Sequence, residues 1–437
     1  MNHLQRTEFI NLLNVETGQF EGKKVTLKNG MIVAKEDALL DQQESFVLPG
    51  LIDSHCHITL SYGSLFTAAG VTSVRNTAGS FYLLAPFFEE DRSVSLPHVY
   101  TTDRMIDGVP GLWGETSIGA LATTSANVAV EEVKRQADLG ASFIKVYGRL
   151  ERRVMEAVVV EANRLGLEVS ADLLGSTDVD ARVAAKIGVR FLEHNSGVLQ
   201  SLIPGWHCLL SEAEDAKLLQ DGLEDDALAT LCDELIKSNV ALVPTLSLFA
   251  QGSQSFKWKP FQTMIGNADH GLREHWNNLR PHINQQKQER LYLLTAKITK
   301  AYHQAGGQLL AGTDTPAGID TFPGQLLHRE LELLVQCGLK PLEALQAATI
   351  TPSRLFKFER ELKVGQVADY IVVKENPLES ISNTQTIQTI VKGGKQYTQE
   401  ELVKEAVEIG KNYDENWHLE KEKMFNKEIH QYHPQLQ

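Results

Sequence analysis

Short stretches of alternating apolar and polar residues lie near both ends of the chain. Residues 6–49 alternate in this way around Gly18, Gly22 and Gly30, and residues 364–391 repeat the texture in VGQVADYIVV and TIVKGG. An alternation of period two between glycine turns predicts short antiparallel strands. We therefore expect the two ends to pair into one small β-domain, a β-sandwich formed from both chain termini.

Between these flanks, short β-rich runs alternate with helical stretches. A helix over 127–139, for example, has Val128, Val133 and Ala137 at helical spacing and Gly140 just past its end. Strands that alternate with helices indicate βα units and a parallel sheet. Eight runs predict an α/β fold of the (β/α)8 TIM-barrel type: 47–57, 71–76, 98–102, 142–148, 167–173, 190–194, 240–248 and 308–314.

These patterns divide the chain into four parts. The predicted segments are 1–49 and 361–399 for the two pieces of the β-sandwich, 50–360 for the barrel, and 400–437 for a helical and then polar tail. Two connections, 195–239 and 249–297, are long. Connections of this length are commonly binding loops or lids, and a surface helical insertion is the equal alternative.

Composition and charge exclude several classes of protein. Among the 437 residues, 42% are hydrophobic, and no apolar run approaches the roughly 18 residues of a membrane-spanning helix. The start MNHLQRTEFINLL lacks the features of an export signal, so we expect a cytoplasmic protein without a membrane partner. A net charge of −14 argues against nucleic-acid binding. The expected partner is a small-molecule substrate, and a homo-oligomer remains possible.

Metal-binding residue types gather at the ends of the predicted strands. His55 and His57 share parity on the first strand, as do Lys145 and Tyr147 on the fourth. Asp172 ends the fifth strand on the face of Ser170, His194 ends the sixth on the face of Leu192, and Asp314 ends the eighth. Residues of one parity near the C-terminal strand ends can converge on one site. Imidazoles and carboxylates suit zinc, manganese or iron, and a bound metal lowers the pKa of a water.

Each of these residues also has a purely structural explanation. A single histidine at a strand end is commonly a hydrogen-bonded structural residue, Lys145 could be ion-paired, and Asp314 could cap the following helix. The pair His55 and His57 favours a metal site, because two imidazoles on one strand face are hard to explain as packing.

Several motifs together resemble the amidohydrolase superfamily. PGLIDSHCH is similar to its first-strand motif, GVTSVRN to the second, FLEHNSG to the sixth and LLAGTDTP to the eighth. GQLLHRELELLVQCGLKPLEALQAAT resembles the helical region that follows, and VGQVADYIVV the returning β-sandwich. The resemblance covers nearly all of residues 20–395. The FIKVYG context looks like the branch with imidazolonepropionase-like and dipeptide-hydrolysing members.

This resemblance implies roles for the candidate residues. His55 and His57 would bind the more buried metal with Asp314, a carbamylated Lys145 would bridge two metals, and His194 would serve the second. Asp314 would also take the proton of the attacking hydroxide and pass it to the leaving nitrogen. Zinc is the expected metal, with one or two ions per chain and with manganese or iron as alternatives.

The chain departs from the pattern of that branch at two positions. The fifth strand normally ends in histidine, where this chain has Asp172. An Asp oxygen can replace the nearer imidazole nitrogen but not the far one, so the substitution could favour manganese or leave a single metal. Asn76 stands where many relatives carry an acidic residue, and a structural turn role is the simplest interpretation.

Three further residues are candidate substrate contacts. Tyr147 could donate a hydrogen bond to the oxygen of a tetrahedral intermediate, or be a core tyrosine. Arg104 could clamp a substrate carboxylate, although a salt bridge is the competing interpretation. His328 could face the barrel mouth, or lie on a helix surface.

The sequence therefore predicts a metal-dependent hydrolase that cleaves a carbon–nitrogen bond in an amide, a cyclic amide or a dipeptide. A lactonase or deaminase using the same residues is one alternative. A non-catalytic barrel that has lost metal through Asp172 is another.

Overall fold

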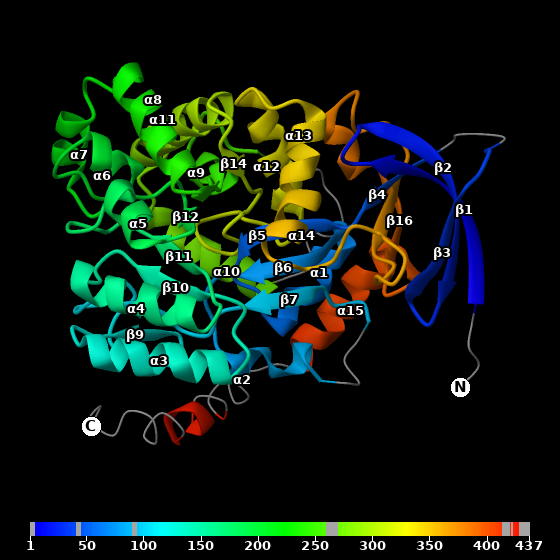
Figure 1. The fold of residues 1–437 in the computed structure, drawn as a ribbon, viewed down its shortest axis with the longest axis horizontal. Helices are drawn as coiled ribbons and strands as arrows, with labels where there is room; N and C mark the ends of the chain where they lie inside the picture. The colour runs from blue at the N-terminus through cyan, green and yellow to red at the C-terminus, as the bar shows by residue number, and fades with distance from the viewer. Residues whose placement is uncertain are drawn as a thin grey trace.

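A computed structural model describes residues 5–40, 45–89, 94–258, 270–412, 420 and 423–427. The barrel and its helices occupy the left and centre of Figure 1, and a separate sheet of strands from both ends of the chain lies at the right. This arrangement confirms the predicted fold class, a (β/α)8 barrel with a small β-domain. The domain boundaries proposed from the sequence stay a prediction.

Eight parallel strand segments form the barrel wall. In order around the barrel they are β5 (Leu51–Cys56), β6 (Val71–Asn76), β7 (His98–Thr101), β10 (Ile144–Tyr147), β11 (Val169–Asp172), β12 (Phe191–Glu193), β13 (Ala241–Val243) and β14 (Gln308–Leu309). The Ser142 amide donates to the Thr101 carbonyl at 2.8 Å, which links β7 to the approach of β10. The Ser54 amide donates to the Ala311 carbonyl at 2.8 Å and links β5 to the segment after β14.

Three of the predicted strand runs differ in detail. The run 47–57 divides at Gly50, where β4 (Phe46–Pro49) joins the terminal sheet and β5 begins the barrel. A side chain at Gly50 would place Cβ 2.1 Å from Oγ1 of Thr72, so only glycine fits there. In the run 240–248 only β13 is a strand, because a helix begins at Leu246. The third strand continues through β8 (Met105–Asp107), with β9 (Ala120–Ala122) beside it.

Helices surround the barrel wall. They are α1 (Gly63–Ala68), α2 (Phe81–Leu84), α3 (Ala126–Asp138), α4 (Arg152–Arg164), α5 (Ala181–Ile187), α6 (Val198–Leu202), α7 (Glu212–Leu218), α8 (Asp225–Lys237), α9 (Leu246–Gly252), α10 (His270–Leu279), α11 (Gln285–Gln304), α12 (Gln325–Gln336), α13 (Pro341–Ala347) and α14 (Ile350–Leu355). Both long connections are thus largely helical where they are described. Residues 259–269, in the second of them, lie outside the described residues.

Apolar side chains pack on both surfaces of the barrel wall. Ile144, Val146 and Leu192 belong to the large cluster between the strands and the helices. Phe191 and Val243 belong to a smaller cluster with Leu310 inside the barrel. Leu192 therefore faces outward and Glu193 inward, and the predicted parity of the sixth strand was wrong.

The terminal strands form one seven-stranded sheet. Its order is β17 (Lys395–Tyr397), β16 (Ile387–Lys392), β15 (Tyr370–Val373), β4, β1 (Gln5–Asn14), β2 (Gln19–Lys28) and β3 (Met31–Asp37). The pairs are antiparallel except for β1 with β4, where Leu12 lies beside Val47. The sheet encloses its own apolar core, in which Leu12, Val25 and Tyr370 are buried.

The tail begins as helix α15 (Gln399–Asn412), which packs on α1. Farther along, Phe425 is buried between the Tyr82 ring and the guanidinium of Arg104. The rest of the tail, at 413–419, 421–422 and 428–437, lies outside the described residues.

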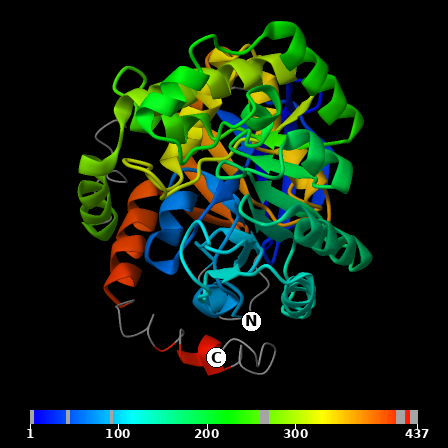
Figure 2. The ribbon, with the colours of Figure 1, turned by 90° about the vertical axis from the view of Figure 1, so that its left-hand side faces the viewer.

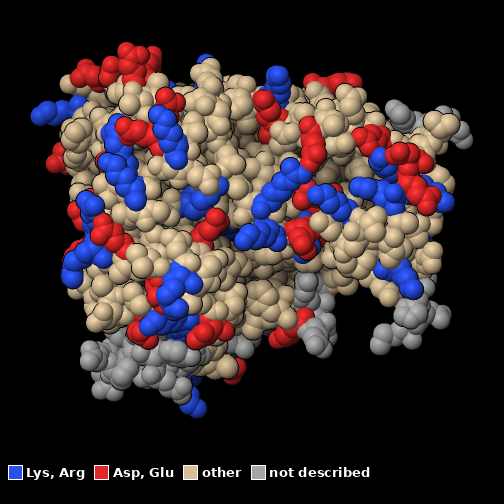
Figure 3. All heavy atoms as spheres, in the orientation of Figure 1, with Lys and Arg blue, Asp and Glu red and all other residues tan. Residues whose placement is uncertain are grey.

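Among the described helices, none combines the length and apolar character needed to cross a bilayer. On the face shown in Figure 3, acidic and basic side chains are interspersed.

Candidate metal centre

The strand ends carry the candidate residues to one side of the barrel, the side that faces the viewer in Figure 2. His55 lies on β5 with His57 just beyond it, Asp172 ends β11, and His194 and Asp314 follow β12 and β14. One ligand atom from each of His55, His194 and Asp314 lies within 4.8 Å of the others. The strand ends thus bring together side chains separated by more than 100 residues.

His55 is fully buried and its ring is held in one orientation. Its Nδ1 lies 2.6 Å from Oε2 of Glu193, whose other oxygen accepts from Arg75 at 2.8 Å and from the Ser170 hydroxyl. Because Nδ1 is turned to this carboxylate, Nε2 is the nitrogen that faces the cluster. That Nε2 has no hydrogen-bond partner among the described residues, yet it lies 3.0 Å from Oδ1 of Asp314.

His57 approaches the same carboxylate from the other side. Its Nδ1 lies 3.4 Å from the Ala78 carbonyl, and its Nε2 lies 3.0 Å from Oδ1 of Asp314. With Nδ1 turned to the carbonyl, Nε2 is again the nitrogen that faces Asp314. The side chain is 28% exposed, so the cluster is open to solvent at this residue.

His194 reaches the cluster through an unusual backbone conformation. Its φ of 60° breaks the alternation of the strand, so that Glu193 and His194 both project toward the barrel interior and mouth. Nδ1 hydrogen-bonds the Thr245 hydroxyl at 2.7 Å, and Nε2 lies 3.5 Å from Oδ2 of Asp172 and 3.9 Å from Oδ2 of Asp314. Burial lowers the pKa of His194 to about 4, which keeps the ring neutral.

Asp314 is the carboxylate that the three rings share. Burial acts to raise its pKa, but the neighbouring rings of His194 and His55 hold the pKa of Asp314 well below the usual range. Asp172 is also buried, and its Oδ1 accepts from the Leu174 amide at 3.0 Å, which leaves Oδ2 toward His194.

Lys145 is a buried amine on the inner face of β10. Its Nζ has no hydrogen-bond partner among the described residues and lies 5.2 Å from the centre of the Tyr147 ring. Burial lowers the pKa of Lys145, against the opposing effects of Glu193 and Asp172. A buried ammonium without a partner is costly, so the site favours an uncharged amine.

The donor set fits a divalent cation. In each of the three imidazoles Nδ1 is hydrogen-bonded outside the cluster, and Nε2 is directed at carboxylate oxygens that cannot donate. Nε2 of His55 and Nε2 of His57 both lie 3.0 Å from the same carboxylate oxygen, and a divalent cation bound among them would take the place of the protons on these nitrogens. Nitrogen and oxygen ligands of this kind suit zinc, and also manganese or iron.

Two candidates for substrate binding lie elsewhere. Arg104 is fully buried and donates from Nε and Nη2 to both oxygens of Glu132 on α3, at 2.9 and 2.6 Å. His328 is buried on α12, where Nε2 donates to the Ala69 carbonyl at 2.9 Å and Nδ1 lies 2.9 Å from Oγ1 of Thr384. Neither side chain is brought to the cluster, because each is already paired by neighbouring elements. Neither is therefore retained as a substrate contact.

Sequence reasoning missed two positioning residues, Glu193 and Thr245, and gave a third, Asn76, only a structural turn role. Glu193 was overlooked because the sixth strand was assigned the wrong parity, although it directly precedes His194. Thr245 has a φ of 47° at the start of α9, which no sequence pattern predicts. Asn76 accepts from the Ile58 amide and donates to the Ala78 carbonyl, both at 2.9 Å, and so holds the carbonyl that receives Nδ1 of His57.

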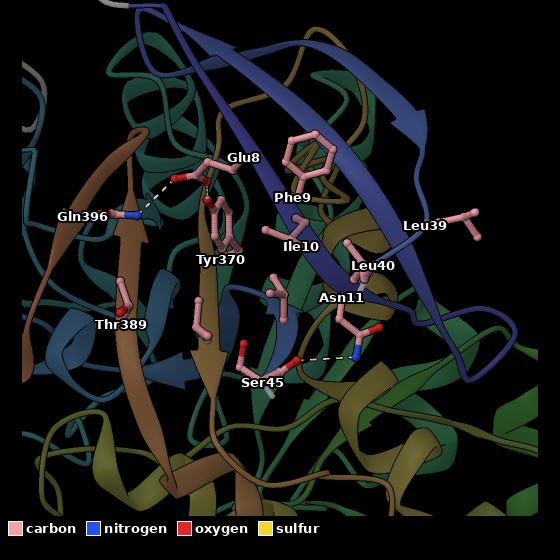
Figure 4. A pocket seen from close by; sticks show the side chains of 12 residues that line it. Glu8, Phe9, Ile10, Asn11, Leu39, Leu40, Ser45, Tyr370, Thr389 and Gln396 are labelled. Carbon is pink, nitrogen blue, oxygen red and sulfur yellow. Dashed lines mark hydrogen bonds between the residues drawn. The ribbon is translucent and has the colours of Figure 1, made fainter. Parts of the chain in front are cut away.

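A hollow of about 610 Å³ lies far from these residues, in the terminal sheet. Figure 4 shows Glu8, Ile10, Leu40 and Thr389 around it. Glu8 is already hydrogen-bonded to Tyr370 and Gln396, and the hollow contains no cluster of histidines. Its size therefore does not make it the candidate site.

Comparisons of this chain with a protein family and with a curated relative agree in kind. Residues 149–397 match the model of the amidohydrolase family. Ochratoxinase of Aspergillus niger is 26% identical over 312 residues, which cover 65% of this chain and 52% of the relative. The chain thus spans about half the length of the curated relative that it matches.

Solved structures share the architecture at low sequence identity. A bottromycin amidohydrolase superposes with a TM-score of 0.71 at 22% identity, over 92% of this chain and 90% of that one. A Xaa-Pro dipeptidase with methionine bound in its active site gives a TM-score of 0.66 at 17% identity, over 90% of this chain and 100% of that one. At these identities the likeness concerns the fold.

Proposed function

The chain belongs to the amidohydrolase family, and we propose that it uses a divalent cation to hydrolyse a carbon–nitrogen bond in an amide, a cyclic amide or a small dipeptide. The single observation that carries the proposal is the convergence of His55, His57 and His194, by their Nε2 atoms, on Asp314. The similar structures include an amidohydrolase and a dipeptidase, which supports this bond type.

The cation would be held by the converging side chains. His55, His57 and Asp314 would hold one ion, and His194 with Asp172 would hold a second. Lys145 would join the two after its neutral amine adds to carbon dioxide, forming an N–C bond and releasing a proton. The buried, unpartnered Nζ supports this modification. Zinc is the proposed metal, with manganese or iron as alternatives, because Asp172 adds a carboxylate oxygen.

A bound divalent cation would lower the pKa of a water and polarise the scissile carbonyl. Asp314 would accept the proton that the attacking water loses as its oxygen bonds to the carbonyl carbon. When the carbon–nitrogen bond breaks, Asp314 would return that proton to the leaving nitrogen. The low pKa of Asp314 keeps the carboxylate ionised at neutral pH, which is the form that can accept this proton.

Tyr147 would assist from the fourth strand. Burial raises the pKa of its phenol, so the hydroxyl keeps its proton at physiological pH. Such a hydroxyl can donate to the oxygen of a tetrahedral intermediate. The alternative is that Tyr147 serves only as a packed tyrosine of the core.

The position of Asp172 supports catalysis over a non-catalytic barrel. Its Oδ2 lies beside the cluster, 3.5 Å from Nε2 of His194, so a carboxylate oxygen is available there in place of the histidine nitrogen. Hydrolysis of a lactone or deamination would use the same residues, and the choice among these reactions rests with the substrate. A small-molecule substrate and a cytoplasmic location stay part of the proposal.

The test is reconstitution of the chain after removal of metal by a chelator. Zinc or manganese should restore hydrolysis of at least one member of a panel of dipeptides and N-acyl amino acids. His55→Ala should lose both metal and activity without unfolding, whereas His303→Ala, on the outer helix α11, should keep both. A folded chain that binds no zinc or manganese, or full activity in His55→Ala, would refute the proposal.

A further inference from the structure

A cavity of about 180 Å³ adjoins the cluster on the side of His57. Its walls come from the segments that follow β5, β6 and β14. Ile58, Leu60, Leu83, Leu84 and Pro316 are its apolar lining, and the ring of His57 forms one edge. Because substrates of such barrels bind among the loops at the C-terminal strand ends, the cavity lies where part of a substrate would lie.

Two residues of the cavity lining lie beside the reacting region. The ring of His57, 28% exposed, faces the cavity and also directs Nε2 at Asp314. Pro316 is only two residues beyond Asp314. A group that occupies the cavity is therefore beside the position where bond cleavage is proposed.

The lining carries no charged side chain, and its polar groups already have partners. The hydroxyls of Thr59 and Ser61 hydrogen-bond each other at 2.8 Å. The Tyr62 hydroxyl donates to the His57 carbonyl at 2.5 Å, and Ser80 accepts from the Tyr82 amide. An apolar occupant would thus leave no polar group newly unpaired, whereas an acidic or basic occupant would find no Asp, Glu, Lys or Arg side chain in the lining to pair with.

The walls are fixed before any substrate arrives. Asn76 ties the segment after β5 to the segment after β6, through the Ile58 amide and the Ala78 carbonyl. The Gly79 amide donates to the Asp103 carbonyl at 3.2 Å. Because the cavity is already formed, binding requires little ordering of the protein around it. Burial of an apolar group there would therefore increase the affinity for the substrate.

We propose that this cavity is a specificity site for an uncharged, apolar substituent next to the scissile bond, such as a branched aliphatic chain or a phenyl ring. This inference rests on the proposed function, because it names the substrate class of the same site. Substrates with an acidic or basic group at this position would be discriminated against.

The experiment compares the binding of two hydroxamates to the zinc-loaded chain by calorimetry. Acetohydroxamate probes the metal alone, and 4-methylpentanohydroxamate adds a branched chain that the cavity would accept. Each buried methylene is worth about fourfold in affinity, so the longer probe should bind at least about tenfold more tightly. Leu83→Trp should fill the cavity and abolish this advantage, while acetohydroxamate binding stays the same. Leu293→Trp, at an exposed position on α11, is the matched control and should change neither.

The outcomes separate the two proposals. If neither hydroxamate binds the zinc-loaded chain, the proposed metal function fails and the specificity site fails with it. Equal affinities in the wild type, or an advantage that survives in Leu83→Trp, would overturn the specificity site alone. Should Leu83→Trp lose acetohydroxamate binding or fail to fold, Leu83→Ala replaces it. That variant should weaken the branched probe severalfold and leave acetohydroxamate unchanged, and an unchanged branched probe would also overturn the site.

Discussion

Nδ1 of His55 lies 2.6 Å from Oε2 of Glu193, with both side chains fully buried inside the barrel. This contact determines which nitrogen of the imidazole faces the barrel mouth. Arg75 donates to the other oxygen of Glu193 and offsets its charge, and the Arg75 guanidinium lies 4.0 Å from the centre of the Phe143 ring. The candidate metal centre is thus supported by an ion pair beneath it.

Glu193→Gln should weaken metal binding without removing a ligand. The variant loses the charge that fixes the His55 tautomer, and loss of such a partner typically costs 10- to 100-fold in metal affinity. Zinc titration against a competing chelator measures the change, with the exposed Glu234→Gln as control. Unchanged zinc affinity in Glu193→Gln would show that the carboxylate has only a packing role.

The Lys145 amine should be carbamylated in the metal-loaded chain. Nuclear magnetic resonance with isotopically labelled bicarbonate should then detect one carbamate signal. The signal should be absent from Lys145→Gln and present in Lys297→Gln, where a half-buried lysine paired with Asp225 on the outer helix α11 is replaced. A carbamate signal that persists in Lys145→Gln, or none in the loaded wild type, contradicts this assignment.

Arg104→Ala should destabilise the fold without affecting substrate binding directly. Arg104 and Glu132 form a fully buried pair, and removal of one partner of such a pair costs about 3–5 kcal/mol of unfolding free energy. Urea unfolding measures this loss, and Arg152→Ala, which breaks an exposed pair on α4, should cost under about 1 kcal/mol. A raised KM with normal stability in Arg104→Ala would restore the role of a substrate clamp.

His328 should make the fold sensitive to acid. Burial lowers its pKa from 6.5 to about 4, so between these pH values the unfolded chain takes up a proton that the folded chain does not. The stability due to neutral His328 is complete above pH 6.5 and is lost as the pH falls through 4, by roughly 3 kcal/mol in all. The unfolding free energy of the wild type should therefore fall relative to His328→Gln over this range. If the difference in unfolding free energy between the wild type and His328→Gln does not change with pH over this range, the proposed titration of His328 is ruled out.

Sequence patterns predicted the barrel and most of the cluster because both depend on local regularity. Strands that alternate with helices indicated the parallel wall, and the shared parity of His55 and His57 placed both rings at one end. His194 does not reach the cluster through strand parity. Its left-handed backbone conformation directs the side chain there. Such a conformation of a non-glycine residue has no clear sequence signal.

The remaining errors concern partners that are distant in sequence. Arg104 meets Glu132 and His328 meets Ala69 only after the helices pack, and the same is true of Thr245 beside His194. A side chain that looks free in the sequence can be fully paired in the fold. For this reason strand-end residues were easier to assign than candidate substrate contacts.

The most direct test of the central claim is an anomalous-scattering map from crystals of the zinc-loaded chain. The account predicts one or two zinc peaks at the barrel mouth, with the first bounded by His55, His57 and Asp314. A fully loaded crystal with no peak there, or with its zinc bound only elsewhere, would contradict it.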